Sequence, residues 1–134
     1  MTLYLDASAL LKRYIAEPGS SLVHTLLAGD QSWVAANHSY PEVVINLQRR
    51  LPSSSVEVAV AAFESDWSRV LVVRLDDRLC HRAAELGPPV GLQTLDAMHL
   101  AAAERAGGAE LTVVTFDDRL AAGARAMGFP VAGV

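Results

Sequence analysis

Short apolar, β-favouring runs alternate along the chain with stretches whose apolar residues recur at helical spacing. The stretches between the runs are too long for hairpin connections, so successive strands are expected to be parallel. This pattern predicts an α/β fold with a central, mostly parallel sheet covered by helices on both faces. The runs that predict strands are TLYL (2–5), SWVAA (32–36), VLVVRL (70–75), LTVVTF (111–116) and, as a short strand or tail, FPVAGV (129–134).

The intervening stretches predict helices, and several begin at residues that favour helix starts. Ser39 is expected to open one helix, and Thr94 is expected to be the N-cap of another. Residues 56–70 are predicted to be helical although three of their valines alternate. The remaining helices are predicted at 7–17, from Ser20 or Ser21 to near Gly29, at 76–87 and at 117–128, with a loop at 88–92.

Composition narrows the class of protein. At 134 residues, with 51% hydrophobic and 19% charged residues, the chain fits one compact domain, 1–134. A net charge of -4, with Lys12 as the only lysine, argues against binding nucleic acid by counterion release alone. A phosphodiester substrate is still allowed, because recruited metal ions would neutralise metal-binding carboxylates. We therefore expect the metal-free protein to bind RNA or DNA poorly.

Other features of the sequence favour a cytoplasmic protein. Cys80 is the only cysteine, so no internal disulfide can form and nothing indicates an oxidising compartment. The first residues lack the basic leader of a signal peptide. No apolar run approaches the roughly 20 residues that span a bilayer, so no membrane is expected.

Four acidic residues stand where a β-rich or apolar run gives way to a helical pattern: Asp6, Glu42, Asp96 and Asp117. In a parallel α/β sheet, helix starts that follow strands lie along the carboxyl edge of the sheet, so these acids can converge. Converging carboxylates suit a hard divalent metal such as Mg²⁺.

Each acid also has an explanation that involves no site. Asp6 and Asp117 can be helix N-caps, and Asp96 can be stabilised by the dipole of its own helix. Glu42 stands three residues after Ser39, the spacing of a capping box. Capping alone gives no reason for acids at so many of these turns, because Ser, Thr, Asn and Gly also cap helices.

Asp76 and Asp77 occur in LDDRL (75–79), which is nearly the same as FDDRL (116–120) around Asp117 and Asp118. If the strand before Asp76 lies at the sheet edge, its acids are ordinary caps. If that strand is central, the proposed site is wrong. Asp117, closer to the strand, is the better candidate to point into the crevice.

Further side chains near the acids are weaker candidates. His99 follows Asp96 by three residues and can contact the site, although a packed histidine is the more common case. Ser8 and Thr115 lie two residues from Asp6 and Asp117, so either hydroxyl can assist an acid or cap a helix. Zinc ligands are not expected, since no metal-ligand spacing links His24, His38, His81 and Cys80.

The blocks LDASALLKRY, SYPEVV, LDAMHLAAA and VVTFDDRLAAGARAMG resemble, in order and spacing, the PIN-domain ribonucleases, and most closely the VapC toxins of VapBC toxin–antitoxin systems. The resemblance implies a flavodoxin-like, three-layer α/β/α sandwich whose acids hold Mg²⁺ or Mn²⁺. The family's acids map onto Asp6, Glu42, Asp96 and Asp117, with Thr115 as the hydroxyl that accompanies Asp117.

The resemblance also implies partners: an RNA substrate, a VapB-type antitoxin lying across the acidic crevice with a basic side chain entering it, and a second copy in a homodimer. Asp76 and Asp77 match nothing catalytic in the family. Gln93 stands in a segment where family members often carry a basic residue, so RNA preference here can differ.

The leading hypothesis is therefore a metal-dependent endoribonuclease toxin. A catalytically silent PIN-like binding scaffold is the alternative. A phosphoacceptor receiver domain needs a lysine on the crevice rim, and Lys12 lies inside the first predicted helix. A dehalogenase-like phosphatase needs an aspartate two positions after Asp6, where Ser8 stands.

Overall fold

The computed structural model describes residues 2–29, 32–107 and 110–134. Within these residues, five strands form one parallel sheet in the order β3-β2-β1-β4-β5. This arrangement confirms the predicted α/β class and the parallel sheet. The strands are β1 (Thr2–Leu5), β2 (Ser32–Ala36), β3 (Leu71–Val73), β4 (Leu111–Thr115) and β5 (Val131–Gly133).

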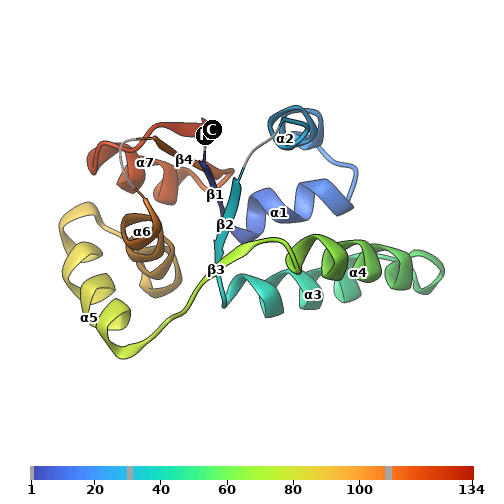
Figure 1. Ribbon diagram of the computed structural model, residues 1–134, viewed down its shortest axis with the longest axis horizontal. Coiled ribbons are helices and arrows are strands. Elements are labelled where there is room, and N and C mark those ends of the chain that lie inside the picture. Colours follow the sequence, from blue (N-terminus) through green and yellow to red (C-terminus); the bar gives the residue numbers. More distant parts are fainter. Residues whose placement is uncertain (1, 30–31, 108–109) are drawn as a thin grey trace.

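Helices cover both faces of the sheet and make the predicted three layers. In Figure 1, α1 to α4 lie on one side and α5 to α7 on the other. None of the helices in the described ranges has the length and apolar character needed to cross a membrane. The helices are α1 (Ala7–Tyr14), α2 (Ser20–Leu27), α3 (Ser39–Arg50), α4 (Ser53–Trp67), α5 (Asp77–Leu86), α6 (Thr94–Ala106) and α7 (Asp118–Ala126), with a short 3₁₀ turn at Pro88–Val90 in the segment expected to be a loop.

The core is divided by the sheet into two parts, as the alternation of side chains along a strand requires. Tyr4 of β1 packs with the buried residues beneath α5 to α7, whereas its neighbours Leu3 and Leu5 pack with those beneath α1 to α4. Because both faces are buried, the strands are almost continuously apolar. Tyr4 thus places a hydroxyl in the α6 side of the core.

The order of the strands decides which acids are central. β1 and β4 are direct neighbours, so the turns that carry Asp6 and Asp117 lie side by side at the carboxyl edge. β3 pairs with β2 alone within the described residues and forms one margin of the sheet. The acids that follow β3, Asp76 and Asp77, are therefore at the periphery. This is the case in which the sequence predicted that they are ordinary caps.

Candidate active site

Asp6 is the most enclosed of the four acids. It follows β1 and caps α1, with its Oδ1 accepting a hydrogen bond from the Ala9 N–H at 2.9 Å. The Ser8 hydroxyl donates to the same oxygen at 2.7 Å, and the Thr115 hydroxyl donates to Oδ2 at 2.6 Å. The predicted cap is confirmed, and the carboxylate is also held from β4.

The two hydroxyls are themselves oriented by the turn after β4. Thr115 Oγ1 accepts the Asp117 N–H at 3.1 Å, and Ser8 Oγ accepts the Phe116 N–H at 3.0 Å. Each hydroxyl thus accepts a backbone N–H and donates its proton to Asp6. Both oxygens of Asp6 act as acceptors, which is the pattern of an ionised carboxylate.

Burial nevertheless disfavours the charge on Asp6. It raises the pKa of the carboxyl, and this effect outweighs the opposing influence of His99 and of the hydrogen bonds from Thr115, Ser8 and Ala9. The hydrogen bonds and the burial thus act against each other. A bound cation would resolve this conflict in favour of the ionised form.

Asp117 also caps a helix, as predicted. Its Oδ1 accepts the N–H groups of Arg119 and Leu120, both at 2.9 Å, at the start of α7. Asp118, the other acid of this turn, is exposed at the first position of α7. The structure therefore associates Asp117 with the turn that touches Asp6, and leaves Asp118 at the surface.

Asp96 lies in the first turn of α6 and responds to all three of the other acids. Its pKa is raised by burial first and then by the charge of Asp117, and to a lesser extent by Asp6 and Glu42; His99, whose effect is smaller than that of Asp117, lowers it. The four carboxylates therefore share one electrostatic neighbourhood. Thr94 is not the N-cap that the sequence predicted, because Gln93 holds that position and makes no side-chain capping bond.

Glu42 is not part of a capping box. His38, rather than Ser39, is the N-cap of α3, and the Ser39 hydroxyl has no hydrogen-bond partner among the described residues. The Glu42 carboxylate instead turns to two histidines, with Oε1 at 3.4 Å from His38 Nε2 and 3.6 Å from His99 Nε2. Burial raises the pKa of Glu42, but His99 and His38 outweigh it and hold the pKa below its usual value.

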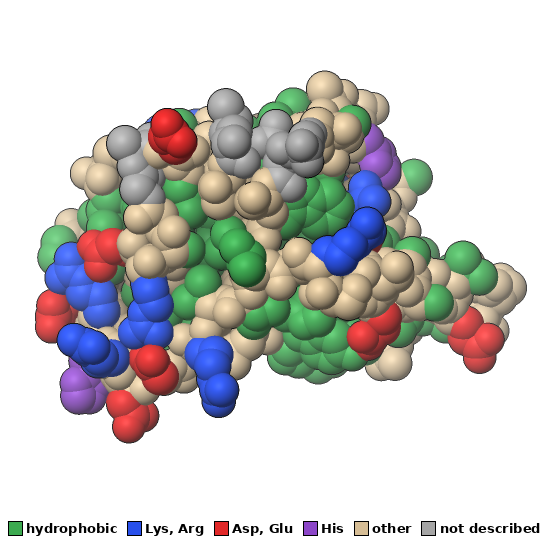
Figure 2. All heavy atoms as spheres, in the orientation of Figure 1, with side chains coloured by type: hydrophobic (Ala, Val, Ile, Leu, Met, Phe, Trp, Pro, Cys, Tyr) green, Lys and Arg blue, Asp and Glu red, His purple; other side chains and the backbone are tan. Residues whose placement is uncertain are grey.

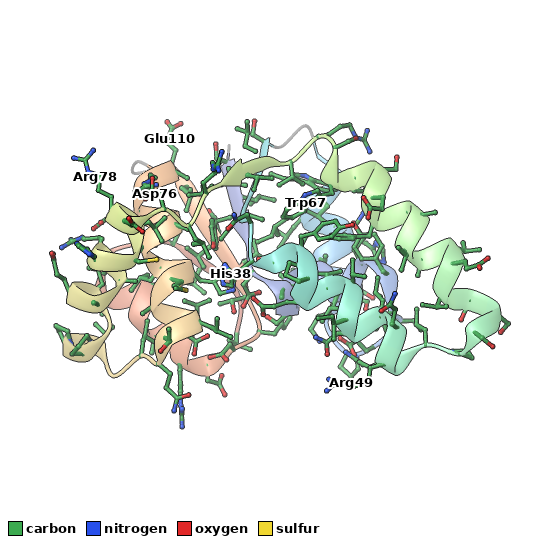
Figure 3. All side chains as sticks on the ribbon, turned by 90° about the horizontal axis from the view of Figure 1, so that it is seen from below. His38, Arg49, Trp67, Asp76, Arg78 and Glu110 are labelled. Atoms are coloured by element: carbon green, nitrogen blue, oxygen red, sulfur yellow. The ribbon has the colours of Figure 1, made fainter. Side chains whose placement is uncertain are left out.

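His99 is a buried residue whose ring is held from β1. Its Nδ1 forms a 2.8 Å hydrogen bond with the Tyr4 hydroxyl, and its ring lies 4.2 Å from that of His38, measured between centroids. Burial, followed by the charge of His99, lowers the pKa of His38 to about 4. In Figure 3, which looks onto this edge of the sheet, His38 lies between the two helical layers.

The sequence analysis missed Tyr4 and His38. The four-residue spacing of His38 and Glu42 was the available signal, because residues four apart share a helix face. A comparison of the histidines with one another and with Cys80 does not reveal this spacing, because the second ligand is a glutamate. Tyr4 left no such signal, since a tyrosine in a buried strand is ordinary.

Within the part of the chain that the structure describes, histidines are the only basic side chains paired with the four acids. Among the described residues, no ion pair joins any of the four acids to an arginine or lysine. Several acids elsewhere are paired: Arg82 contacts Glu104 and Glu85, and Arg105 contacts Asp76. Figure 2 shows this mixture of blue and red side chains over the α5 side of the molecule. Oxygen ligands without an arginine or lysine partner fit Mg²⁺ or Mn²⁺.

Fold and site together define a small α/β domain with a cluster of acids at the carboxyl edge of the sheet, beside the β1–β4 junction. The PIN domain family model matches residues 3–126, and the chain belongs to the PIN-domain family. This confirms the resemblance found in the sequence, including its VapC branch. Ribonuclease VapC49 of Mycobacterium tuberculosis H37Rv is 34% identical over 134 residues, covering 96% of this chain and 93% of that protein. Ribonuclease VapC46 of the same strain is 32% identical over 129 residues, covering 96% and 95%.

Solved structures agree on the fold. VapC20 of M. tuberculosis, a sarcin–ricin loop cleaving toxin, superimposes with a TM-score of 0.73 at 20% identity, covering 98% of each chain. The DNA-bound VapBC of Salmonella typhimurium superimposes with a TM-score of 0.68 at 18% identity, covering 98% of this chain and 97% of that one. These matches confirm the predicted three-layer PIN-like sandwich.

Proposed function

We propose that the protein is a metal-dependent endoribonuclease and the toxin of a toxin–antitoxin pair. One observation carries the proposal: four carboxylates from separate parts of the chain share one neighbourhood with no arginine or lysine paired to them in the described residues. Such an arrangement is unfavourable unless cations occupy it. The ribonuclease names of the VapC relatives support RNA as the substrate.

Asp6, Glu42, Asp96 and Asp117 would hold Mg²⁺ or Mn²⁺. The ion would favour deprotonation of an attacking water and stabilise charge on the phosphate, leaving a 5′-phosphate and a 3′-hydroxyl. Asp6 accepts three hydrogen bonds, and a carboxylate has about four acceptor sites, so one remains for an ion. The hydrogen bonds from Ser8 and Thr115 favour the ionised form of Asp6 and fix its orientation.

The decisive experiment compares cleavage of a panel of RNAs by the wild type in Mn²⁺ and in chelator with cleavage by Asp6→Asn, Asp96→Asn and the double variant. We expect cleavage only with the metal and loss of cleavage in the variants. Asp76→Asn is the matched control, because it removes an acid from an equivalent turn outside the site. Unchanged cleavage by a folded double variant would refute the proposal, and a metal-binding protein that cuts no RNA would point to the silent scaffold.

A VapB-type antitoxin is the proposed partner, because solved relatives include VapBC complexes. Exposed apolar side chains on two neighbouring helices fit a protein-binding surface: Ile45 of α3 is 60% exposed and Val58 of α4 is 73% exposed. Co-expression with the antitoxin should give a stable complex that elutes as one species and cuts RNA slowly. A complex that stays fully active would contradict inhibition at the crevice.

A homodimer, the single domain over 1–134 and a cytoplasmic location stay predictions. Sedimentation of the isolated protein tests the first of them. A monomer at micromolar concentration would contradict it. Limited proteolysis tests the second, since one domain should give one resistant core.

A further inference from the structure

Beside the acidic crevice, a glutamate and two histidines form a compact group of potential ligands: His38, Glu42 and His99. One ligand atom of each lies within 4.8 Å of those of the other two. The distances from Glu42 Oε1 are 3.4 Å to His38 Nε2 and 3.6 Å to His99 Nε2. A tetrahedral ion with bonds of 2.0 to 2.1 Å separates its ligand atoms by about 3.3 Å. The two Glu42 distances are close to this value, and the ligand atoms of the two histidines, which lie within 4.8 Å of each other, would approach by about 1.5 Å at most.

The three side chains are positioned by different elements. His38 and Glu42 are four residues apart at the start of α3, whereas His99 comes from α6 across the crevice. The hydrogen bond between His99 Nδ1 and the Tyr4 hydroxyl leaves Nε2 facing Glu42, and Nε2 has a free lone pair for a metal in the tautomer in which Nδ1–H is the donor. Metal-binding histidines characteristically have their other ring nitrogen hydrogen-bonded in this way, which fixes the ring.

The polar atoms of the group lack other partners. Both ring nitrogens of His38 and Oε1 of Glu42 are buried, and none makes a hydrogen bond of normal geometry within residues 2–29, 32–107 and 110–134, although the Leu95 backbone lies close enough to His38 to act on the pKa of its ring. Buried polar atoms are nearly always paired, so an orphaned set that faces one point calls for an explanation. A cation at that point would satisfy the nitrogen and oxygen atoms that face it.

We propose that His38, Glu42 and His99 form a binding site for a transition-metal ion of the Zn²⁺ class, which adjoins the Mg²⁺ or Mn²⁺ ligand set and shares Glu42 with it. Imidazole nitrogens favour Zn²⁺ over Mg²⁺, and three protein ligands leave a fourth position for water. Glu42 belongs to both ligand sets. Zinc at this site therefore withdraws Glu42 from the acidic crevice and inhibits RNA cleavage, a consequence that rests on the proposed nuclease function.

Direct binding measurements test the site without reference to activity. Tag-free, metal-free protein would be titrated with Zn²⁺ by calorimetry and with Co²⁺ by visible absorption. His38→Ala and the bulkier His38→Gln remove one ligand, and His81→Ala removes an exposed histidine of α5 as a matched control. Circular dichroism without metal would establish that all variants are folded.

We expect the wild type and His81→Ala to bind one equivalent and to give the intense bands of tetrahedral Co²⁺. Both His38 variants should bind at least about tenfold more weakly, since losing even a hydrogen-bond partner of a ligand costs about 10- to 100-fold. Equal affinity in the wild type and the His38 variants would overturn the site.

A second arm tests the sharing of Glu42. Each protein would be assayed with Mg²⁺ and RNA, with and without Zn²⁺, and compared with itself. At tenfold excess over its dissociation constant, Zn²⁺ should slow the wild type roughly tenfold and the His38 variants much less. Zinc binding through His38 with undiminished cleavage would overturn the sharing of Glu42. If no protein cuts RNA, the nuclease proposal fails, while the titrations still decide the zinc site.

Discussion

Two turns of this protein have almost the same sequence but different surroundings: LDDRL (75–79) after β3 and FDDRL (116–120) after β4. Locally they fold alike. Asp76 accepts the Leu79 N–H at 2.9 Å and caps α5, and Asp117 accepts the Leu120 N–H at 2.9 Å and caps α7. The capping function is thus set by the local sequence.

The charge environment is set by the position of each turn in the sheet. Asp76 follows the marginal strand β3, and Arg105 contacts it at 2.9 Å. Hydrogen bonds from Arg105 and then from the Leu79 N–H lower the pKa of Asp76 to about 2. Asp117 follows the central strand β4 and acts on Asp96 as a repelling charge. One turn is a neutralised cap, and the other is a cap that adds to an acidic crevice.

The largest expected difference between the turns is in RNA cleavage. Asp117→Asn should slow cleavage roughly 100-fold or more, because losing even an indirect partner of a metal costs about 10- to 100-fold. Asp76→Asn should leave the rate nearly unchanged. Asparagine caps helices about as well as aspartate, so both variants keep their helix starts. Equal losses of rate in both would remove the distinction between the turns.

Metal-linked stability is the next test. At 100 times its dissociation constant, Mn²⁺ should stabilise the wild type and Asp76→Asn by about 2.7 kcal/mol, seen as a higher melting temperature. Asp117→Asn should lose most of this gain. In chelator, however, Asp117→Asn should melt slightly above the wild type, because it removes a charge that repels Asp96. If Mn²⁺ stabilises Asp117→Asn as much as it stabilises the wild type, the ion binds at a site that does not include Asp117.

The residue two positions before each aspartate sharpens the comparison further. Thr115→Val removes a hydrogen bond to Asp6 and leaves the Asp117 N–H without its acceptor, so the free energy of unfolding should fall by about 1 to 3 kcal/mol. Thr115→Ser should restore most of it. Arg74→Ala, at the matching position, should have little effect in the same urea titration. A neutral Thr115→Val would contradict the role of its hydroxyl.

The smallest effect concerns Arg105. The pKa of Asp76 is lowered in the folded state, so its ion pair stabilises the fold above the ordinary carboxyl pKa and this contribution is lost as the pH falls to about 2. Arg105→Ala should therefore be slightly less stable than the wild type at pH 7 and equal to it near pH 2. Added salt should shrink the difference, because the pair is exposed. Arg119→Ala, in the other turn, should show no such pH dependence.

Much of the fold was predictable because strand and helix periodicities are local properties. The alternating valines of 56–70 were correctly assigned to a helix, α4, since the flanking pattern is helical. The position of β3 was not predictable, because strand order depends on long-range packing. Asp76 and Asp117 are therefore indistinguishable in sequence, and only the sheet separates them.

Around the four acids, the predictions of helix N-caps were wrong where tertiary contacts outweighed local residue preferences. Ser39 and Thr94 are favourable caps by residue type, yet the helices begin with His38 and Gln93 as N-caps. The capping box that was the alternative explanation for Glu42 does not form, and His99 from another helix lies 3.6 Å from Glu42 instead. Tyr4 contributes through its hydroxyl, whose direction depends on the register of a buried strand. No pattern along the chain encodes such contacts.

The buried alanines of α6 make the position of the site residues sensitive to substitutions outside the site. Ala97, Ala101, Ala102 and Ala103 are buried, and α6 is packed between α5, α7 and the sheet. Small side chains let the helix approach its neighbours closely, with no slack for added atoms. Asp96 and His99 stand on this helix, so a single methyl group gained on its hidden face would shift both together. Substitution of these alanines by larger residues can therefore inactivate the protein although all four acids are retained.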